Sequence, residues 1–270
     1  MKIIDAHLHI FGERPWAERM AQQVGHRNSA QHLVQYYAQH GFAHGIVMAN
    51  APLTEHTCRE LPPQFSYCIG LDSGVMQNLP PNAPEIVEAH LQKSTCVGIK
   101  LYPGYNHSYI YDEIYEPYYE LAAKYHKPVA VHTGATNGSR AKLRYAHPLT
   151  LDDAAADHPD VQFVMCHFGN PFLAEAAAVL EKNPNVSADL SGLLGGAFET
   201  GALNRAQAGY MEMLKAWLRY VGDWNKFMFG TDWPLVNLAE YAKWVQTLVP
   251  ENEWEKVFFD NANRIYQLGL

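Results

Sequence analysis

The segment Ile3-Ile4-Asp5-Ala6-His7-Leu8-His9-Ile10 determines how the rest of this chain is interpreted. Its composition predicts a β-strand, in which alternate side chains share a face. Asp5, His7 and His9 are therefore expected on one face, and the apolar residues on the other, packed under a layer of helices. Two histidines spaced in this way can hold one metal ion between them. They can equally line a polar surface, and this segment alone leaves both interpretations open.

Three later strand-like runs favour the metal site, because each also ends in a residue type that binds metals. They are Val129-Ala130-Val131-His132, Phe163-Val164-Met165-Cys166-His167 and Phe227-Met228-Phe229-Gly230-Thr231-Asp232. Chance rarely places four such strand ends in one chain.

Eight short apolar runs predict strands, and most of them are separated by a helical pattern. The predicted strands cover residues 3–10, 45–50, 65–72, 96–102, 129–132, 161–167, 185–191 and 226–232. The predicted helices cover residues 29–41, 84–92, 117–125, a segment starting at Thr150 as N-cap, 172–181, 205–220, 238–249 and 261–268. Residues 11–28 are expected to form a long loop, of the kind that is often functional or mobile.

This alternation indicates an α/β fold with a parallel sheet, and eight units in this length correspond to a (β/α)8 TIM barrel. A doubly wound sheet is the rival, but no glycine-rich nucleotide turn follows the first strand. The chain lacks a linker-like, repetitive or low-complexity stretch. We therefore expect one barrel domain over residues 1–270.

Composition narrows the class of partner. The formal net charge is −8, which argues against nucleic acid or an anionic membrane. No apolar run reaches the about 18 residues that a membrane helix needs, and Met1-Lys2 leads straight into the first strand without a signal-peptide pattern. The four cysteines show no paired CxxC spacing. Buried free thiols in a cytoplasmic protein are expected.

In a parallel barrel the carboxyl ends of all strands emerge on one face, where active sites lie. His7, His9, His132, His167 and Asp232 all fall at such ends. Taken one by one, each histidine could be a core residue and Asp232 a helix cap. Taken together, neutral imidazoles and a carboxylate form a catalytic metal sphere of the zinc type.

The sequence as a whole resembles the amidohydrolase superfamily. Within it, the resemblance is to the amidohydrolase-2 group, which is similar to aminocarboxymuconate-semialdehyde decarboxylase. The resemblance runs from the first strand to Asn261-Ala262-Asn263-Arg264, and so spans nearly the whole chain. It depends on the order and spacing of six short motifs. They are Asp5-Ala6-His7-Leu8-His9, Gly98-Ile99-Lys100-Leu101-Tyr102-Pro103, Val131-His132-Thr133-Gly134, Cys166-His167-Phe168-Gly169, Asp189-Leu190-Ser191-Gly192 and Phe229-Gly230-Thr231-Asp232-Trp233-Pro234.

The resemblance implies a role for each site residue. His7, His9 and His132 would bind the metal, and Asp232 would be both a ligand and the acid–base that handles the proton of water. His167 would lie beside the metal and polarise the substrate or steady the hydroxide. A divalent ion lowers the pKa of bound water from 15.7 towards about 7, and a neighbouring carboxylate can then take the proton and return it to the leaving group.

Lys100 is left with three interpretations. The resemblance implies either a carboxylated lysine that bridges two metals or an amine that holds a substrate carboxylate. The third is an internal ion pair with Asp5 or Asp72, since a buried ammonium needs a partner. Tyr102 is predicted to contact substrate, and other candidates on the loop face are Trp16, Arg14 and Arg140.

These observations predict a metal-dependent hydrolase that acts on a small-molecule ester, lactone or amide. Non-oxidative decarboxylation of an aromatic or unsaturated acid is the alternative, because the resemblance implies both reactions with the same ligands. A barrel that binds metal without catalysis is the alternative from another class. The expected cofactor is Zn²⁺, one ion rather than two, with Mn²⁺ as a substitute. The expected partner is a small-molecule substrate, and a homodimer is a possible assembly.

Overall fold

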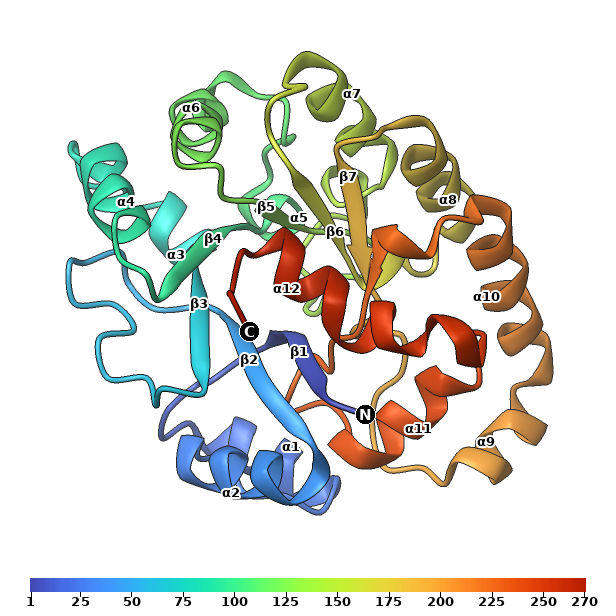
Figure 1. Cartoon of the computed structure of the whole chain (residues 1–270). Coiled ribbons are helices and arrows are strands. Elements are labelled where there is room, and N and C mark those ends of the chain that lie inside the picture. The colour runs from blue at the N-terminus through green and yellow to red at the C-terminus, as the bar shows by residue number, and fades with distance from the viewer.

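The computed structural model describes residues 1–270, apart from the side chain of Ser73. Its strands form one parallel sheet in the order β1 to β8 (Figure 1). They are β1 Ile3–Leu8, β2 Phe42–Met48, β3 Phe65–Leu71, β4 Cys96–Leu101, β5 Val129–His132, β6 Phe163–Cys166, β7 Val186–Asp189 and β8 Phe227–Met228. The helices are α1 Pro15–Gln23, α2 Ala30–His40, α3 Ser73–Met76, α4 Ala83–Leu91, α5 Pro103–Asn106, α6 Glu116–Tyr125, α7 Leu149–Asp157, α8 Leu173–Lys182, α9 Thr200–Ala206, α10 Ala208–Val221, α11 Leu238–Gln246 and α12 Asn261–Ile265.

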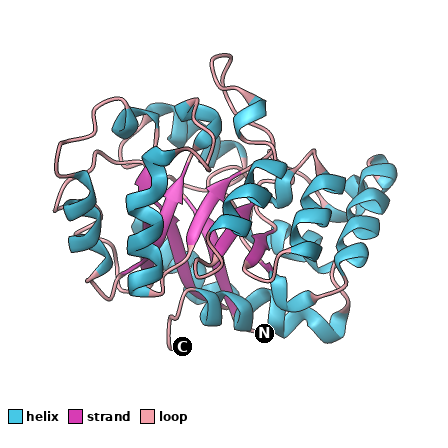
Figure 2. Ribbon diagram, turned by 90° about the horizontal axis from the view of Figure 1, so that it is seen from above, coloured by secondary structure: helices cyan, strands magenta, loops and turns pink.

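Backbone hydrogen bonds close the sheet between its first and last strands. The Ala6 amide donates to the Phe229 carbonyl (2.9 Å), and the Asp232 amide donates to the His7 carbonyl (2.8 Å). The His9 amide donates in turn to the Trp233 carbonyl (3.1 Å). The segment after β8 therefore completes the barrel, as the TIM-barrel prediction requires, and the prediction is confirmed. Figure 2 shows the strands at the centre with the helices around them.

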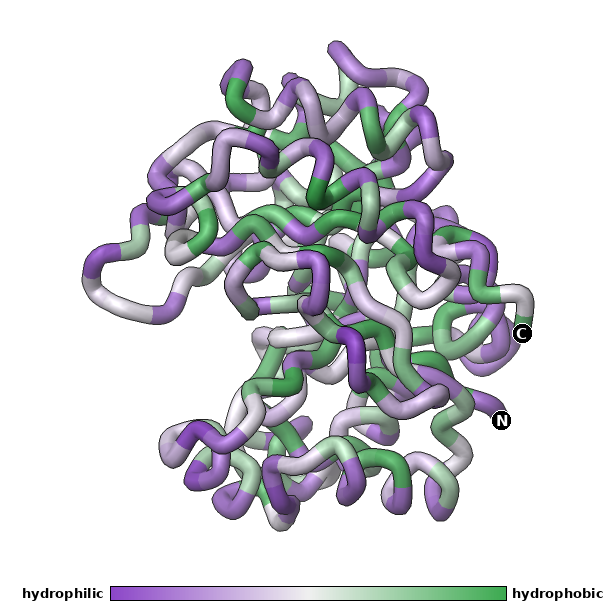
Figure 3. Tube along the Cα trace, turned by 90° about the vertical axis from the view of Figure 1, so that its left-hand side faces the viewer, coloured by the Kyte–Doolittle hydropathy of each residue, from purple (hydrophilic) through white to green (hydrophobic). Residues whose placement is uncertain are grey.

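Apolar side chains form two layers, one inside the barrel and one between the sheet and the helices. Small and medium side chains fill the interior, including Ile4, Ala6, Ile46, Ala130 and Val164. Larger groups such as Phe163 and Trp244 fill the outer layer. The hydrophobic segments accordingly lie towards the middle of the trace, and hydrophilic ones towards its outside (Figure 3). All strand residues are buried except Ala43, as expected for strands covered on both faces.

The prediction for the faces of β1 was wrong in part. Asp5 points outward to α2, where its carboxylate accepts a hydrogen bond from the Tyr37 hydroxyl (3.1 Å). Ile4 and Ala6 face the barrel interior, whereas Leu8 packs in the outer layer as predicted. The register of β1 against β2 shifts between Asp5 and Leu8. Such an irregularity breaks the strict alternation of side chains, so Asp5 does not share the face of His7.

The helix predicted at residues 29–41 is confirmed with its caps. Ser29 Oγ accepts a hydrogen bond from the His32 amide (3.1 Å), and Gly41 ends α2 at φ 80°. The long loop predicted over residues 11–28 instead contains α1. Pro15 lies at its first turn, and Ala17 and Ala21 are its buried residues. This helix is short and has little apolar surface, which is why its pattern is weak in the sequence.

The remaining differences are the short helices α3 and α5, which were not predicted, and the boundaries of several elements. Pro148 occupies the N-cap of α7, and Thr150 lies inside the helix with its hydroxyl on the His147 carbonyl (2.8 Å). The helix predicted at residues 205–220 is α10 preceded by the separate helix α9. All four cysteines are free, three of them buried and Cys58 half-buried, which confirms the expected thiols. Within the described residues, helices long and apolar enough to cross a membrane are absent.

Candidate metal centre

A cavity of about 340 Å³ opens at the carboxyl ends of the strands. Its wall combines histidines and Asp232 with the polar side chains Asn50, Asp72 and Asn137 and with aromatic and apolar side chains from the loops. The wall comprises His9, Phe11, Trp16, Met20, Asn50, Asp72, Tyr102, Tyr105, His132, Asn137, His167, Asp232, Trp233, Pro234 and Leu235. This size is typical of a small-molecule site.

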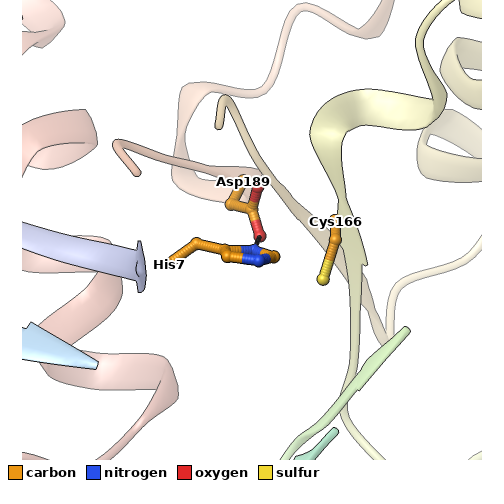
Figure 4. A group of neighbouring side chains, drawn as sticks. All are labelled: His7, Cys166 and Asp189. Atoms are coloured by element: carbon orange, nitrogen blue, oxygen red, sulfur yellow. Dashed lines mark hydrogen bonds and ion pairs between the residues drawn. The ribbon is translucent and has the colours of Figure 1, made fainter. Parts of the chain in front are cut away.

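His7 is fully buried at the base of this group, and Asp189 fixes its orientation (Figure 4). Its Nδ1 lies 2.9 Å from Asp189 Oδ2. Because a carboxylate only accepts, Nδ1 carries the proton and Nε2 presents a lone pair. Nε2 is buried and has no hydrogen-bond partner among the described residues. An orphaned buried acceptor is costly unless something else, such as a cation, binds it.

His9 is oriented in the same way by a backbone carbonyl. Its Nδ1 lies 2.8 Å from the Met48 carbonyl oxygen, so this nitrogen donates and Nε2 is the acceptor. Nε2 then lies 3.2 Å from Asp232 Oδ1, and His7 Nε2 lies 3.6 Å from the same oxygen. Two imidazole lone pairs therefore approach one carboxylate oxygen.

His132 and His167 add two further lone pairs. The Ala135 carbonyl lies 2.9 Å from His132 Nε2, which assigns the proton to that nitrogen. The Ser191 hydroxyl (2.9 Å) and carbonyl (3.3 Å) lie against His167 Nδ1. The remaining nitrogens, His132 Nδ1 and His167 Nε2, face each other at 3.2 Å. With both protons held elsewhere, two acceptors face each other without a proton between them.

The donor set fits a divalent cation. Ligand atoms of His7, His167 and Asp232 all lie within 4.8 Å of one another, and His9 and His132 flank this group. Neutral imidazole nitrogens with a carboxylate suit zinc and related first-row metals. His167 was predicted to lie beside the metal. Its ligand nitrogen lies within 4.8 Å of the ligand atoms of both His7 and Asp232, the same limit that holds between these two predicted ligands. These residues could hold one ion, with the cavity open on the opposite side.

The electrostatic environment keeps these groups in the metal-binding form. Burial lowers the pKa of His7 to about 4, against the opposing effect of Asp189. Burial also lowers the pKa values of His132 and His167. Burial alone would raise the pKa of Asp232, but His167, His9 and His7 together lower it. At neutral pH His7, His132 and His167 are therefore neutral imidazoles, and Asp232 is an ionised carboxylate.

The backbone around the site adopts unusual conformations. His167, Phe168 and Asp232 have φ values of 64°, 44° and 54°, in a region that side chains other than glycine rarely adopt. Gly192 lies so close that a Cβ there would come within 2.6 Å of His167 Nδ1 and 3.1 Å of Asp232 Oδ2. Strained residues of this kind cluster at functional sites, and only glycine leaves room for these two side chains.

Asp189 was not predicted as a site residue. Besides holding His7, its Oδ1 accepts hydrogen bonds from the His167 amide (2.9 Å) and the Ser191 amide (3.2 Å). Its position at the end of β7 was the available signal, because strand ends meet on one face. His7, Cys166 and Asp189 form a second close group, but its His7 nitrogen already donates to Asp189. We regard this group as the support beneath the ligands.

Lys100 does not adopt the expected ion pair. Its ammonium donates to Cys166 Sγ at 2.7 Å and lies 5.1 Å from the centre of the Tyr102 ring. Ion pairs of Lys100 with Asp5 or Asp72 are absent from the described residues. The side chain is fully buried and is not part of the cavity wall, so the geometry does not support contact between its amine and substrate.

The other loop-face candidates have different outcomes. Tyr102 and Trp16 line the cavity, whereas Arg14 is the N-cap of α1 and does not line it. Arg140 lines a neighbouring hollow. Asp72 is a wall residue that the sequence analysis assigned only as an ion-pair partner. Its position at the end of the predicted strand 65–72 was the available signal, as for Asp189, because strand ends meet on one face.

The geometry can now be compared with known proteins. A family model described as Amidohydrolase matches residues 4–268. The chain belongs to the amidohydrolase family. This family is metal-dependent and enzymatic, in agreement with the donor set. No curated protein matches the chain.

Solved structures share the amidohydrolase barrel over its whole length. An uncharacterised TIM-barrel protein from Bordetella bronchiseptica is 20% identical, with a TM-score of 0.73 and complete coverage of both chains. A probable 2-pyrone-4,6-dicarboxylic acid hydrolase from Acinetobacter baumannii, with citric acid bound, is 15% identical (TM-score 0.64; 99% and 100% covered). A dihydroxybenzoic acid decarboxylase from Polaromonas, with manganese and 2-nitroresorcinol bound, is 15% identical (TM-score 0.65; 100% and 98% covered).

Proposed function

We propose that this amidohydrolase hydrolyses a small-molecule ester, lactone or amide with one divalent metal ion. The observation that carries the proposal is the convergence of imidazole lone pairs at one place. Those of His7 and His9 approach Asp232, and those of His132 and His167 face each other beside it. Each is fixed by a hydrogen bond at the other nitrogen of its ring. This constellation is typical of a catalytic metal site with an open position. His7, His9, His132 and Asp232 would hold the ion, with His167 as a fifth candidate.

A divalent cation would supply acidity to water and polarise a carbonyl oxygen. The chain's own residues would do the rest. Asp232 would accept the proton of the attacking water and return it to the leaving oxygen or nitrogen. His167 would stabilise the charge that develops on the substrate's carbonyl oxygen. The apolar part of the substrate would pack against the aromatic side chains of Phe11, Trp16 and Trp233. These side chains would exclude water from their side of the cavity.

Zinc is the proposed metal, because imidazole and carboxylate ligands suit it, and manganese is the substitute, as in one structural neighbour. One ion is favoured over two. A second ion would need a carboxylated Lys100 as a bridge, whereas the amine of Lys100 donates to Cys166 Sγ in a fully buried position.

Non-oxidative decarboxylation remains the second candidate. Decarboxylases resemble this chain as closely as hydrolases do, with TM-scores of 0.65 and 0.64 in the two examples above. The site residues would hold an ion that neutralises the carboxylate of such a substrate. Asp232 would take a proton from water and deliver it to the carbon that loses CO₂.

The test begins with metal content. Purified protein should contain about one equivalent of zinc or manganese, and His7→Ala should lose it while the far-ultraviolet circular dichroism is unchanged. Metal-loaded protein is then offered esters, lactones, amides and aromatic acids in water enriched in ¹⁸O. Hydrolysis places ¹⁸O in the acid product, whereas decarboxylation releases CO₂ and leaves a product that has lost its carboxyl group. A protein that neither contains nor gains a transition metal contradicts both candidates.

A further inference from the structure

The cavity wall has an uneven distribution of charge. Its described residues include two carboxylates, Asp72 and Asp232, and neither lysine nor arginine. Asp232 is engaged by the histidines, at 3.2 Å from His9 and 3.6 Å from His7. Asp72 lies outside both groups of close metal-ligand atoms. Its negative charge is therefore available to whatever fills the cavity.

Asp72 is positioned by its own backbone. It follows β3, and its Oδ1 accepts a hydrogen bond from the Val75 amide (3.0 Å) at the start of α3. Its neighbours on the wall are Asn50, after β2, and Tyr102, after β4. Adjacent strands thus present a polar wall, in which Asp72 is the one carboxylate, on the side of the cavity away from β8, which brings Asp232.

The loop after β1 and the segment after β8 supply an aromatic wall. Phe11 packs on Trp16, with ring centres 4.5 Å apart, and stacks on the ligand His9 at 5.2 Å. Trp233 contributes from the β8 side and is almost completely buried. Rings bind well against such surfaces, and the faces of tryptophan also attract cations.

Lysine and arginine are absent from the described wall of the cavity. Lys100 is fully buried and bound to Cys166 Sγ. Arg140 lines the neighbouring hollow, together with Gln77 and His107. A carboxylate at the end of the substrate remote from the metal would therefore meet Asp72 without a compensating cation.

We propose that the site takes ring-containing substrates whose remote end is neutral or cationic, and that Asp72 selects them. The substrate's ring would lie against Phe11, Trp16 and Trp233. A hydroxyl, amine or ammonium on its remote end would donate to Asp72, while an anionic group there would be rejected. The inference names the substrate class of the proposed hydrolase and rests on that function.

The experiment compares three ligands of one shape, 4-methylbenzyl alcohol, 4-(aminomethyl)benzyl alcohol and 4-(hydroxymethyl)benzoate. Binding to the metal-loaded protein is measured from the change in tryptophan fluorescence, to which Trp16 and Trp233 on the cavity wall contribute, so turnover is not required. The ammonium compound should bind about five- to tenfold more tightly than the methyl compound, because charge-assisted hydrogen bonds are the strong ones. The proposal is overturned if the ammonium compound shows no preference over the methyl compound.

Variants assign this preference to Asp72. In Asp72→Asn, the amide oxygen can still cap the Val75 amide, so only the charge is removed, and the affinities for the ammonium and methyl compounds should become equal. Asp112→Asn is the matched control, since Asp112 caps the Tyr109 amide (2.8 Å) outside the cavity. Its preference should equal that of the parent protein. A preference that survives in a folded Asp72→Asn protein contradicts the assignment.

A variant that adds negative charge to the wall, instead of removing it, tests the proposal if Asp72→Asn does not fold. Asn50→Asp adds a second carboxylate to the same exposed part of the wall, and the preference for the ammonium compound should increase. An unchanged or smaller preference contradicts the proposal. Because all these measurements are of binding, a protein that prefers the cation but hydrolyses no ester would contradict the proposed function alone.

Discussion

At the scale of single residues, the site depends on the nitrogen of each imidazole that does not face the centre. Asp189 holds Nδ1 of His7, and backbone carbonyls hold Nδ1 of His9 and Nε2 of His132. Each of these partners accepts a proton, so each ring is left with its lone pair towards the centre. Tautomers are therefore assigned by groups that touch neither metal nor substrate.

Asp189→Asn should reverse the tautomer of His7. The new amide can present its NH₂ group to His7 Nδ1, which would then accept, and the proton would move to Nε2 and block it. Metal affinity should fall about 10- to 100-fold, as for other partners behind metal ligands. Metal titration with a competing chelator measures this. Asp152→Asn, which removes a surface contact with Lys182 (2.8 Å), should leave the affinity unchanged.

Asp232→Asn separates the two roles proposed for Asp232. The amide oxygen can still bind a metal, but the group cannot accept a proton. Turnover should therefore decrease about 10²- to 10⁴-fold, while metal content changes little. Steady-state kinetics and elemental analysis of the same sample check this. Near-native kcat in this variant would mean that another group carries the proton.

At the scale of elements, the junction between β1 and β8 joins the ends of the barrel and carries ligands on both sides. Asp5 lies behind it and accepts four hydrogen bonds. Its donors are the His7 amide (3.3 Å), the Thr231 amide (2.9 Å), the Thr231 hydroxyl (2.6 Å) and the Tyr37 hydroxyl (3.1 Å). The irregularity in β1 directs Asp5 to this role while His7 faces the site.

Asp5→Ala should lower the free energy of unfolding by about 3 kcal/mol, because it leaves buried donors such as the Thr231 amide without an acceptor. Tyr37→Phe removes one of the same hydrogen bonds and should cost about 1 kcal/mol. Urea unfolding followed by circular dichroism measures both. Equal losses in the two variants would show that the junction does not depend on the carboxylate.

At the scale of the whole molecule, loops far apart in sequence pack together beside the site. His26 is 4% exposed, lies against Trp233 with ring centres 5.0 Å apart, and accepts a hydrogen bond from the Leu238 amide (3.3 Å). Its other nitrogen lies 2.9 Å from His32. Burial, followed by the charges of His32 and His40, lowers the pKa of His26 to about 4.

This cluster predicts a loss of stability in mild acid. An unfolded histidine has a pKa of about 6.5, so the unfolded chain binds a proton at a higher pH than folded His26 does. Stability should therefore be complete above pH 6.5 and decline as the pH falls towards 4. At pH 5, His26 should lower the free energy of unfolding by on the order of 1 to 2 kcal/mol relative to its value at pH 7.5. Urea midpoints at pH 7.5 and 5.0, with chelator present to exclude metal release, measure it.

His26→Gln is the variant for this comparison, since the amide oxygen can still accept from the Leu238 amide. Its midpoint should change less between the two pH values than that of the parent protein. His56→Gln, at an exposed position, serves as the control and should behave like the parent. The same pH dependence in all three proteins would exclude His26 as the cause.

The sequence by itself determined the barrel and the identity of the converging groups. Eight apolar runs alternating with helices specify a parallel sheet that is covered on both faces. The number of units, and the absence of a glycine-rich nucleotide turn after the first strand, favour the closed barrel over a doubly wound sheet. Since the carboxyl ends of parallel strands emerge on one face, the sequence predicted that five side chains would converge. They are His7, His9, His132, His167 and Asp232. Helix caps, such as Ser29 and Gly41 at the ends of α2, were also predicted correctly, because they depend only on residues nearby in the sequence.

Only the tertiary structure decided which atoms those groups present and what surrounds them. The proton on each imidazole is set by partners such as Asp189 and the Met48 carbonyl, which lie 182 and 39 positions away. The irregularity of β1 turned Asp5 outward, against strict alternation. The position of Lys100 beside Cys166, and that of Asp72 on the cavity wall, follow from packing between strands. The periodicity of a sequence predicts which face of its element a residue occupies, but it does not predict the contacts that distant segments make with that residue.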